Sequence, residues 1–356
     1  MLDKFINRFS GFSEIYSFYD GEVEIMYDKD AHTYLLVQGD ELIPQPSVTT
    51  IVKESVNKSE ILIPWACKMM GEKIVKSIPQ FPYTLTETGT HRLINKCKGA
   101  HREKLDEAGM LGNMAHNWIE KYINNRLVNT CEYIPDPNMP QDERVVSAIN
   151  AALDWMKAHN VRWISTERKI YSRIHKYAGT MDGLALTDSC SDPTCCPQKY
   201  TDRLSLVDWK TSNNLYLDYL FQISAYWGAY REETGIVPED GWVIRLGKED
   251  AEFDPWHIWD TNEFEIYYYG FLNSRKWYES MKYAEEQVKI KNERLRDLRA
   301  EQRKKIKEEQ LAIKCKNADK YKGMRYPVCN GGNPCQACLA KWAEQHPITE
   351  SALDKT

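Results

Sequence analysis

The stretch Lys176–Tyr230 reads KYAGTMDGLALTDSCSDPTCCPQKYTDRLSLVDWKTSNNLYLDYLFQISAYWGAY and combines two apolar runs with a helical pattern. The runs AGTMDGLAL and LSLVDWKTS have the composition of buried strands, and the residues after them predict a helix. Asp182 lies within the first run. Asp208 and Lys210 lie two residues apart in the second, so their side chains share one face of a strand. We therefore expect an α/β fold that brings two carboxylates and an ammonium together.

Such a group of charges is costly to bury unless its members pair or hold a cation. Carboxylate oxygens are hard ligands that suit Mg²⁺. The sequence therefore predicts a magnesium site with Asp182 and Asp208 as ligands and Lys210 beside the attacking water. In the helix that follows, Gln222 and Tyr226 are four residues apart and lie on a common face.

Five segments, taken in order along the chain, carry a family resemblance. They are PSVTTI (46–51), GNMAH (112–116) with Glu120 after it, GTMD (179–182), VDWKTS (207–212) and QISAY (222–226). Together they resemble the PD-(D/E)XK nucleases of the RecB type, and within that superfamily they are most similar to phage exonucleases and the mitochondrial genome maintenance exonuclease. The resemblance covers roughly residues 25–245.

The resemblance implies a central mixed β-sheet flanked by helices, with an N-terminal helical lobe. It also implies a metal-dependent DNA exonuclease that hydrolyses phosphodiester bonds in phage or bacterial DNA replication, recombination or repair. The implied catalytic residues are Asp182, Asp208, Lys210, Gln222 and Tyr226. The implied ligands of Mg²⁺ or Mn²⁺ are His116, Asp182, Asp208 and the main-chain carbonyl of Trp209, with Glu120 as a further candidate. The implied DNA contacts are Ser47, Thr49, Thr211 and Ser212.

Other interpretations of the same residues stay open. Without the resemblance, His116 is an ordinary helix histidine, Glu120 a surface carboxylate and Ser47 a helix cap. We interpret Glu167 as an ordinary strand carboxylate, the alternative being that it points into the site. The chain as a whole could be a catalytically silent DNA-binding subunit, or a scaffold that docks a single-strand-binding or recombination protein.

Length and composition limit the class of protein. The chain has 356 residues, of which 42% are hydrophobic and 28% charged, and this is typical of a globular protein with one large or two ordinary domains. No apolar run approaches the ~20 residues that span a bilayer. The N-terminus MLDKFINRFSGF lacks the apolar core of a signal peptide. We therefore expect a cytoplasmic, intracellular protein that binds no membrane.

The charge is unevenly distributed. Residues 275–325 contain 17 basic and 9 acidic residues, a local charge of +8, whereas the whole chain has a charge of −5. An acidic body with one basic arm is compatible with nucleic-acid binding, although a solvated charged helix gives the same pattern.

The C-terminal segment contains Cys315, Cys329, Cys335 and Cys338, the last two as Cys-x-x-Cys. Four thiolates in a short glycine-containing segment predict a structural Zn²⁺ site. An iron–sulfur cluster is the alternative, since some RecB-like nucleases carry one. Their first cysteine lies ahead of the catalytic residues, whereas all four lie after them here. Unliganded cysteines are the simplest alternative.

A second group, Cys190, Cys195 and Cys196, lies between the strands that carry Asp182 and Asp208. These three sulfurs are one ligand short of a closed site. A histidine, an aspartate or a distant cysteine (Cys67, Cys97 or Cys131) could complete it, and a plain turn is the alternative.

The chain order predicts four parts: an N-terminal hairpin and helical lobe (1–108), a nuclease core (109–260) with a Cys-rich insertion (188–200), a long charged helix (261–314) and a Cys-rich tail (315–356). Within them we expect a hairpin or meander over 22–43, helical structure over 61–108 with breaks at Pro79–Pro82 and Gly89, and a helix over 141–159. The aromatic start of the long helix, including Trp277, should pack on the body.

Overall fold

Two β-sheets are formed by the residues that the computed structural model describes, which are 13–80, 86–127 and 134–318. The first sheet is an antiparallel meander with the strand order β1-β2-β3-β4. Its strands are β1 (Ser13–Phe18), β2 (Val23–Asp28), β3 (Thr33–Gln38) and β4 (Glu41–Gln45). Of the hairpin or meander predicted over residues 22–43, the structure shows the meander, and it begins earlier than predicted, with β1.

The second sheet has five strands in the order β5-β6-β7-β8-β9. They are β5 (Arg162–Ser172), β6 (Tyr177–Thr187), β7 (Arg203–Lys210), β8 (Asp240–Leu246) and β9 (Phe253–Ile258). Only β7 and β8 pair in parallel, and α7 (Leu217–Thr234) forms the crossover between them, as parallel pairing requires. This is the mixed sheet that was expected. Strand β9 was not predicted, because Pro255 interrupts an otherwise short pattern.

The remaining helices come mainly from the segment between the two sheets. They are α2 (Val48–Ser55), α3 (Ser59–Ser77), α4 (Glu87–Cys97), α5 (Ala100–Leu127), α6 (Glu143–Ala158) and α8 (Thr261–Ala318), with a 3-10 turn at Ile78–Gln80. The predicted break at Gly89 is wrong. The amide of Gly89 donates a hydrogen bond of 3.2 Å to Thr86 Oγ1, so this residue lies in the capped first turn of α4.

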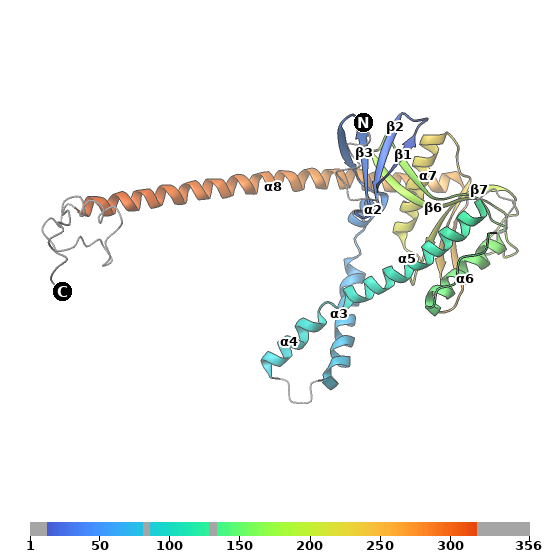
Figure 1. Cartoon of the computed structure of the whole chain (residues 1–356), viewed down its shortest axis with the longest axis horizontal. Coiled ribbons are helices and arrows are strands. Elements are labelled where there is room, and N and C mark those ends of the chain that lie inside the picture. The colour runs from blue at the N-terminus through green and yellow to red at the C-terminus, as the bar shows by residue number, and fades with distance from the viewer. Residues whose placement is uncertain (1–12, 81–85, 128–133, 319–356) are drawn as a thin grey trace, which may run out of the picture. The chain divides into compact units, whose positions relative to one another are not determined.

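Apolar side chains cover both faces of the five-stranded sheet. On one face, α2, α7 and the start of α8 pack against residues such as Leu206 and Val243. On the other, α5 and α6, which lie side by side in Figure 1, pack against Val207 and Trp209. Because side chains alternate along a strand, Asp208 and Lys210 share the α7 face with Leu206. The fold therefore directs both towards α7.

The chain divides into two compact units, Met1–Glu279 and Ser280–Thr356, and the start of α8 belongs to the first. Phe264, Tyr268 and Phe271 are buried there, as expected, but Trp277 is 56% exposed. In the second unit, every described side chain from Ser280 to Glu308 is exposed, which agrees with the lack of an apolar stripe in its sequence. Within the described residues, no helix has the length and apolar character needed to cross a membrane.

Candidate active site

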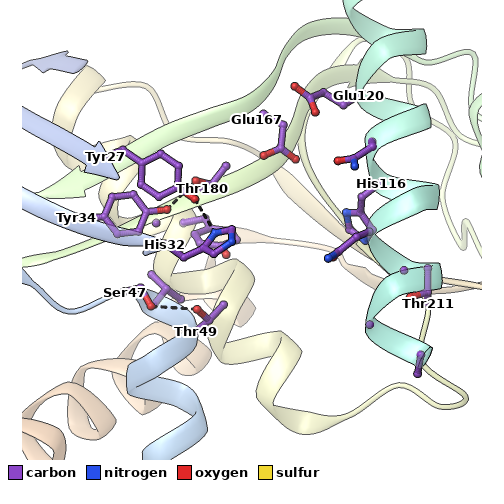
Figure 2. Close-up of a pocket in the computed structure, with 18 residues that line it drawn as sticks. Tyr27, His32, Tyr34, Ser47, Thr49, His116, Glu120, Glu167, Thr180 and Thr211 are labelled. Atoms are coloured by element: carbon purple, nitrogen blue, oxygen red, sulfur yellow. Dashed lines mark hydrogen bonds between the residues drawn. The ribbon is translucent and has the colours of Figure 1, made fainter. Parts of the chain in front are cut away.

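Two adjoining cavities of about 620 and 950 Å³ form a cleft in the first unit. Figure 2 shows the smaller one, with Tyr27 and Tyr34 of the N-terminal sheet on one side and His116 and Glu120 of α5 on the other. Glu167 lies between these walls. The larger cavity continues to Asp182 and Lys210. The cleft therefore contains most of the side chains that the sequence singled out.

One imidazole and two carboxylates meet in this cleft. Ligand atoms of His116, Glu167 and Asp182 all lie within 4.8 Å of one another. His116 Nδ1 is 3.7 Å from Asp182 Oδ2. The same oxygen accepts a hydrogen bond of 2.8 Å from the amide of Trp209, which fixes the carboxylate against β7. The group offers one nitrogen and two oxygen donors to a single cation, a donor set that suits Mg²⁺ and Mn²⁺.

The position of Glu167 corrects the interpretation of this residue as an ordinary strand carboxylate. Its neighbours Thr166 and Arg168 pair with Gly183 and Met181, which sets Glu167 opposite Asp182. Its φ of 49° lies in the left-handed region, which is uncommon for a residue with a side chain and is often found at functional sites. An alternating strand pattern does not indicate a left-handed residue within the strand. Only the carboxylate side chain of Glu167 hinted at a place in the cleft.

Glu167 also has an unusual ionisation. Burial, followed by the negative charge of Asp182, raises its pKa from 4.5 to about 8. Close carboxylates disfavour joint ionisation unless a cation lies between them. Burial is the larger cause of the raised pKa and the charge of Asp182 adds to it, and a divalent ion between the two carboxylates would favour their ionised forms.

Asp208 belongs to a second, adjoining group. Its carboxylate is buried and lies 2.6 Å from Lys210 Nζ. Gln222 joins the two, because its Oε1 accepts from Lys210 at 3.2 Å while its Nε2 donates to Asp208 at 3.2 Å. The same Nε2 donates to the hydroxyl of Tyr226 at 2.8 Å. The helix pair Gln222 and Tyr226 thus contacts the strand pair Asp208 and Lys210.

The pKa values of Asp208 and Lys210 are both raised in this second group. Burial raises the pKa of Asp208 to about 7, against the opposing effect of Lys210. Burial acts to lower the pKa of Lys210, but the negative charges of Asp208 and Asp182 more than offset it and raise that pKa. Lys210 is therefore an ammonium at neutral pH.

The other predicted metal ligands have different settings. Glu120 lines the cleft one turn beyond His116 on α5. The amide of Trp209 is engaged by Asp182, and its side chain is buried on the opposite face of the sheet. Asp208 is not among the three residues whose ligand atoms cluster. A ligand role for Glu120, for Asp208 or for the carbonyl of Trp209 stays a prediction.

The candidate DNA contacts all line the cleft. Ser47 borders the smaller cavity, Ser212 the larger one, and Thr49 and Thr211 both. Ser47 is also the N-cap of α2, since its Oγ accepts from the amide of Thr50 at 3.1 Å. The cap that the sequence predicted is therefore confirmed, and it leaves Ser47 at the cleft wall.

Some of the cysteines lie in the part of the chain that the structure describes, and others lie outside it. Cys190, Cys195 and Cys196 lie together with His159, which identifies a histidine beside the insertion. Of the alternatives considered from sequence, Cys67 is exposed on α3 and Cys97 is buried on α4. Cys131, Cys329, Cys335 and Cys338 lie outside the described residues, as does the side chain of Cys315.

Comparisons with known proteins yield little. No family model matches the chain, and no curated protein matches it. Among solved structures, an alkaline exonuclease from Laribacter hongkongensis is similar over 48% of this chain and 84% of the exonuclease, with 14% sequence identity and a TM-score of 0.24. A TM-score of this size does not establish a common fold.

Proposed function

We propose that this protein is a Mg²⁺- or Mn²⁺-dependent deoxyribonuclease that acts as an exonuclease. The observation that carries the proposal is the meeting of two groups in one cleft: the ligand set of His116, Glu167 and Asp182, and the ammonium of Lys210 held by Asp208. Phosphodiester hydrolysis needs a cation near the phosphate and a donor for the charge that develops on its oxygens. The cleft offers residues for both.

The metal-ligand set fits a divalent ion on chemical grounds. Glu167 and Asp182 lie close together, burial and the charge of Asp182 raise the pKa of Glu167 to about 8, and an imidazole nitrogen of His116 lies beside them. The imidazole favours Mn²⁺ somewhat more than an all-oxygen site would. When bound, the ion would polarise a phosphate oxygen and lower the pKa of a bound water.

The second group acts directly on the phosphate in this proposal. Lys210 is charged and is held from one side by Asp208 and from the other by Gln222. These contacts restrict its ammonium, so little orientation has to be acquired during the reaction. Because its pKa is raised, Lys210 stabilises negative charge on the phosphate and orients the water rather than taking a proton from it.

Features of the cleft wall support a nucleic-acid substrate. Tyr27, Trp65 and Tyr219 line the two cavities and are partly exposed, and aromatic rings at such positions can stack on bases. The hydroxyls of Thr49 and Thr211 can donate to phosphate oxygens.

Digestion of labelled DNA tests the proposal. Linear single- and double-stranded DNA, labelled at either end, and closed circular DNA are incubated with the full chain and Mg²⁺ or Mn²⁺. We expect linear DNA to be degraded from an end and circles to survive, and chelation to stop the reaction. Asp182→Asn and Lys210→Gln should each lower the rate at least about a hundredfold. Gln keeps a hydrogen-bond donor beside Asp208, which limits damage to the fold.

Matched substitutions at exposed positions are the controls. Asp202→Asn and Lys68→Gln remove the same charges outside the cleft and should leave the rate unchanged. Binding of DNA without cleavage under every metal condition would support a silent DNA-binding subunit instead. Cleavage of closed circles would change the proposal to an endonuclease.

A further inference from the structure

A second group of metal-ligand side chains lies outside the cleft, where the loop that joins β6 to β7 meets the C-terminal end of α6. It consists of His159, Cys190, Cys195 and Cys196, and ligand atoms of all four lie within 4.8 Å of one another. Cys190 Sγ is 3.4 Å from Cys196 Sγ, and Cys195 Sγ is 3.4 Å from His159 Nε2. Ligands of a tetrahedral zinc ion are separated by roughly 3.5–3.8 Å, given the usual Zn–S and Zn–N lengths. The observed spacing is close to that of a closed zinc site.

The imidazole of His159 is oriented as a ligand would be. Its Nδ1 lies 2.9 Å from the carbonyl oxygen of Trp155, so this nitrogen carries the proton and donates it to the carbonyl. Nε2 is then left with a lone pair on the side of Cys195. A hydrogen bond from the distal ring nitrogen to a carbonyl is the usual way in which a zinc-bound histidine is fixed.

Packing holds the ring in that orientation. His159 is fully buried, and its ring stacks on Trp155 at a centroid distance of 4.9 Å and meets the edge of Trp242 at 4.7 Å. The ring nitrogen that faces the sulfurs is therefore placed before any ion binds, which lowers the entropy cost of ligation.

The loop that carries the cysteines is ordered by its own hydrogen bonds. Asp192 Oδ1 accepts from the amide and the hydroxyl of Thr194 at 2.8 and 2.7 Å, and the amide of Cys196 donates to the carbonyl of Asp192 at 2.8 Å. The resulting turn brings Cys195 and Cys196 back towards Cys190.

Donors near the sulfurs would offset the charge of a complete site. Three thiolates and a neutral imidazole around Zn²⁺ have a net charge of −1. The amide of Cys190 donates to Cys196 Sγ at 3.3 Å, and the hydroxyl of Tyr200 lies 3.9 Å from the same sulfur. The ammonium of Lys199 lies 2.6 Å from the carbonyl of Cys190. These groups provide positive potential around the thiolates.

From this geometry we propose that His159, Cys190, Cys195 and Cys196 bind one structural Zn²⁺, distinct from any ion in the cleft. Binding replaces the three thiol protons, which pass to solvent, and requires no oxidant. The sulfur-rich set excludes Mg²⁺, and its four protein donors leave no open position for a substrate.

The site would brace the sheet behind the cleft. The loop that carries the cysteines connects β6, which bears Asp182, to β7, which bears Asp208. Trp155, which holds His159, also meets Trp209 edge-on at a centroid distance of 5.4 Å. Loss of zinc should therefore loosen the packing between α6 and the strand that contains Asp208, without removing any residue from the cleft.

The experiment measures zinc in the full-length chain. The tail can contribute metal of its own, so the parent for all variants carries Cys329→Ser, Cys335→Ser and Cys338→Ser. After mild chelation that strips exposed ions, elemental analysis of this parent should give about one zinc per chain. Adding Cys195→Ser with Cys196→Ser should remove it, whereas adding Cys67→Ser, at an exposed cysteine outside the group, should not.

A measurement on the unmutated chain covers the case in which the variant fails to fold. Alkylation under native conditions, followed by peptide mass mapping, should leave Cys190, Cys195 and Cys196 unmodified until a strong chelator removes zinc. Cobalt added to the stripped chain should give the near-ultraviolet band of thiolate-to-cobalt charge transfer. A parent without zinc, zinc that survives Cys195→Ser with Cys196→Ser, or a disulfide between Cys190 and Cys196 would each overturn the proposal.

Discussion

Glu167 combines two unfavourable features in a single residue. Its backbone is left-handed and its carboxylate is crowded by Asp182, which together indicate a position kept for a reason other than stability. In our proposal the reason is metal binding. Glu167 then destabilises the metal-free chain, whereas in the metal-bound chain its carboxylate is a ligand.

Replacement of this carboxylate by an amide separates the two effects. Glu167→Gln keeps the shape of the side chain but removes a carboxyl whose raised pKa makes the metal-free folded chain less stable at neutral pH. We expect the metal-free variant to unfold at a higher temperature than the parent, and its affinity for Mn²⁺ to fall at least about tenfold because one charged ligand is removed. Thermal unfolding in a chelator and calorimetric titration with Mn²⁺ measure the two changes. An unchanged affinity would remove Glu167 from the ligand set.

The pKa of Glu167 also predicts a pH dependence. Its carboxyl titrates at about 8 in the folded chain, against an ordinary value of 4.5. Between these values the folded chain binds more protons than the unfolded chain, so the free energy of unfolding falls as the pH rises. Asp208, whose pKa is raised from 3.8 to about 7, acts in the same direction.

We therefore expect the metal-free chain to lose stability between about pH 5 and pH 8, and Mn²⁺ affinity to rise over the same interval as protons stop competing. Denaturant midpoints measured in a chelator check the first part, and Mn²⁺ titrations at each pH check the second. The decline in stability should be shallower for Glu167→Gln. An equally steep decline in that variant would assign the pH dependence to other groups.

At the scale of elements, the cleft depends on how closely α5 approaches the end of β7. Gly112 of α5 allows this approach, because a Cβ built on it would lie 2.7 Å from Thr211 Oγ1. His116 is one turn further along the same helix, so the distance between α5 and β7 also sets how far the imidazole stands from Asp182.

A pair of substitutions measures this close approach. Gly112→Ala alone should lower the free energy of unfolding by about 1 kcal/mol or more, because overpacking exceeds the gain in helix propensity. Combined with Thr211→Ala, which removes the clashing hydroxyl, the same change should be neutral or stabilising by up to about 1 kcal/mol. Denaturant unfolding of the four chains of this cycle gives the coupling. Additive effects would show that the two residues do not limit the approach.

At the scale of the whole molecule, α8 contributes to two units. Its first turns place Phe264, Tyr268 and Phe271 in the core of the unit Met1–Glu279, whereas its described side chains from Ser280 to Glu308 are exposed. The position at which the chain is shortened should therefore decide between a folded and an unfolded product.

Truncation after Glu279 should leave a folded, cleaving protein, and truncation after Asp260 should not fold, because it removes three buried aromatic rings. The basic residues beyond Glu279 bind DNA phosphates in our proposal, so the shorter folded chain should bind DNA more weakly. Its log affinity should also depend less steeply on log salt, by about 0.7–0.9 for each phosphate that the shorter chain no longer neutralises. Circular dichroism and binding assays over a range of salt concentrations check these points. An unchanged salt dependence would leave the segment as a solvated helix.

The sequence by itself determined the main elements and their order. The apolar runs that became β6 and β7, the cap at Ser47 and the helix that carries Gln222 and Tyr226 depend on local patterns, which act over a few residues and can be recognised without the fold. The two-residue spacing of Asp208 and Lys210 likewise fixed their common face. The family motifs added His116, which the structure brings to 3.7 Å from Asp182.

Only the tertiary structure decided which residues from distant segments meet. Glu167 faces the cleft because of its left-handed backbone conformation and the pairing of β5 with β6, and a strand pattern in the sequence predicts neither. His159 joins three cysteines more than thirty residues away because α6 packs on the sheet and Trp155 orients its ring. Ligand sets of this kind depend on packing between elements, whereas sequence periodicity reports only which face of each element is buried.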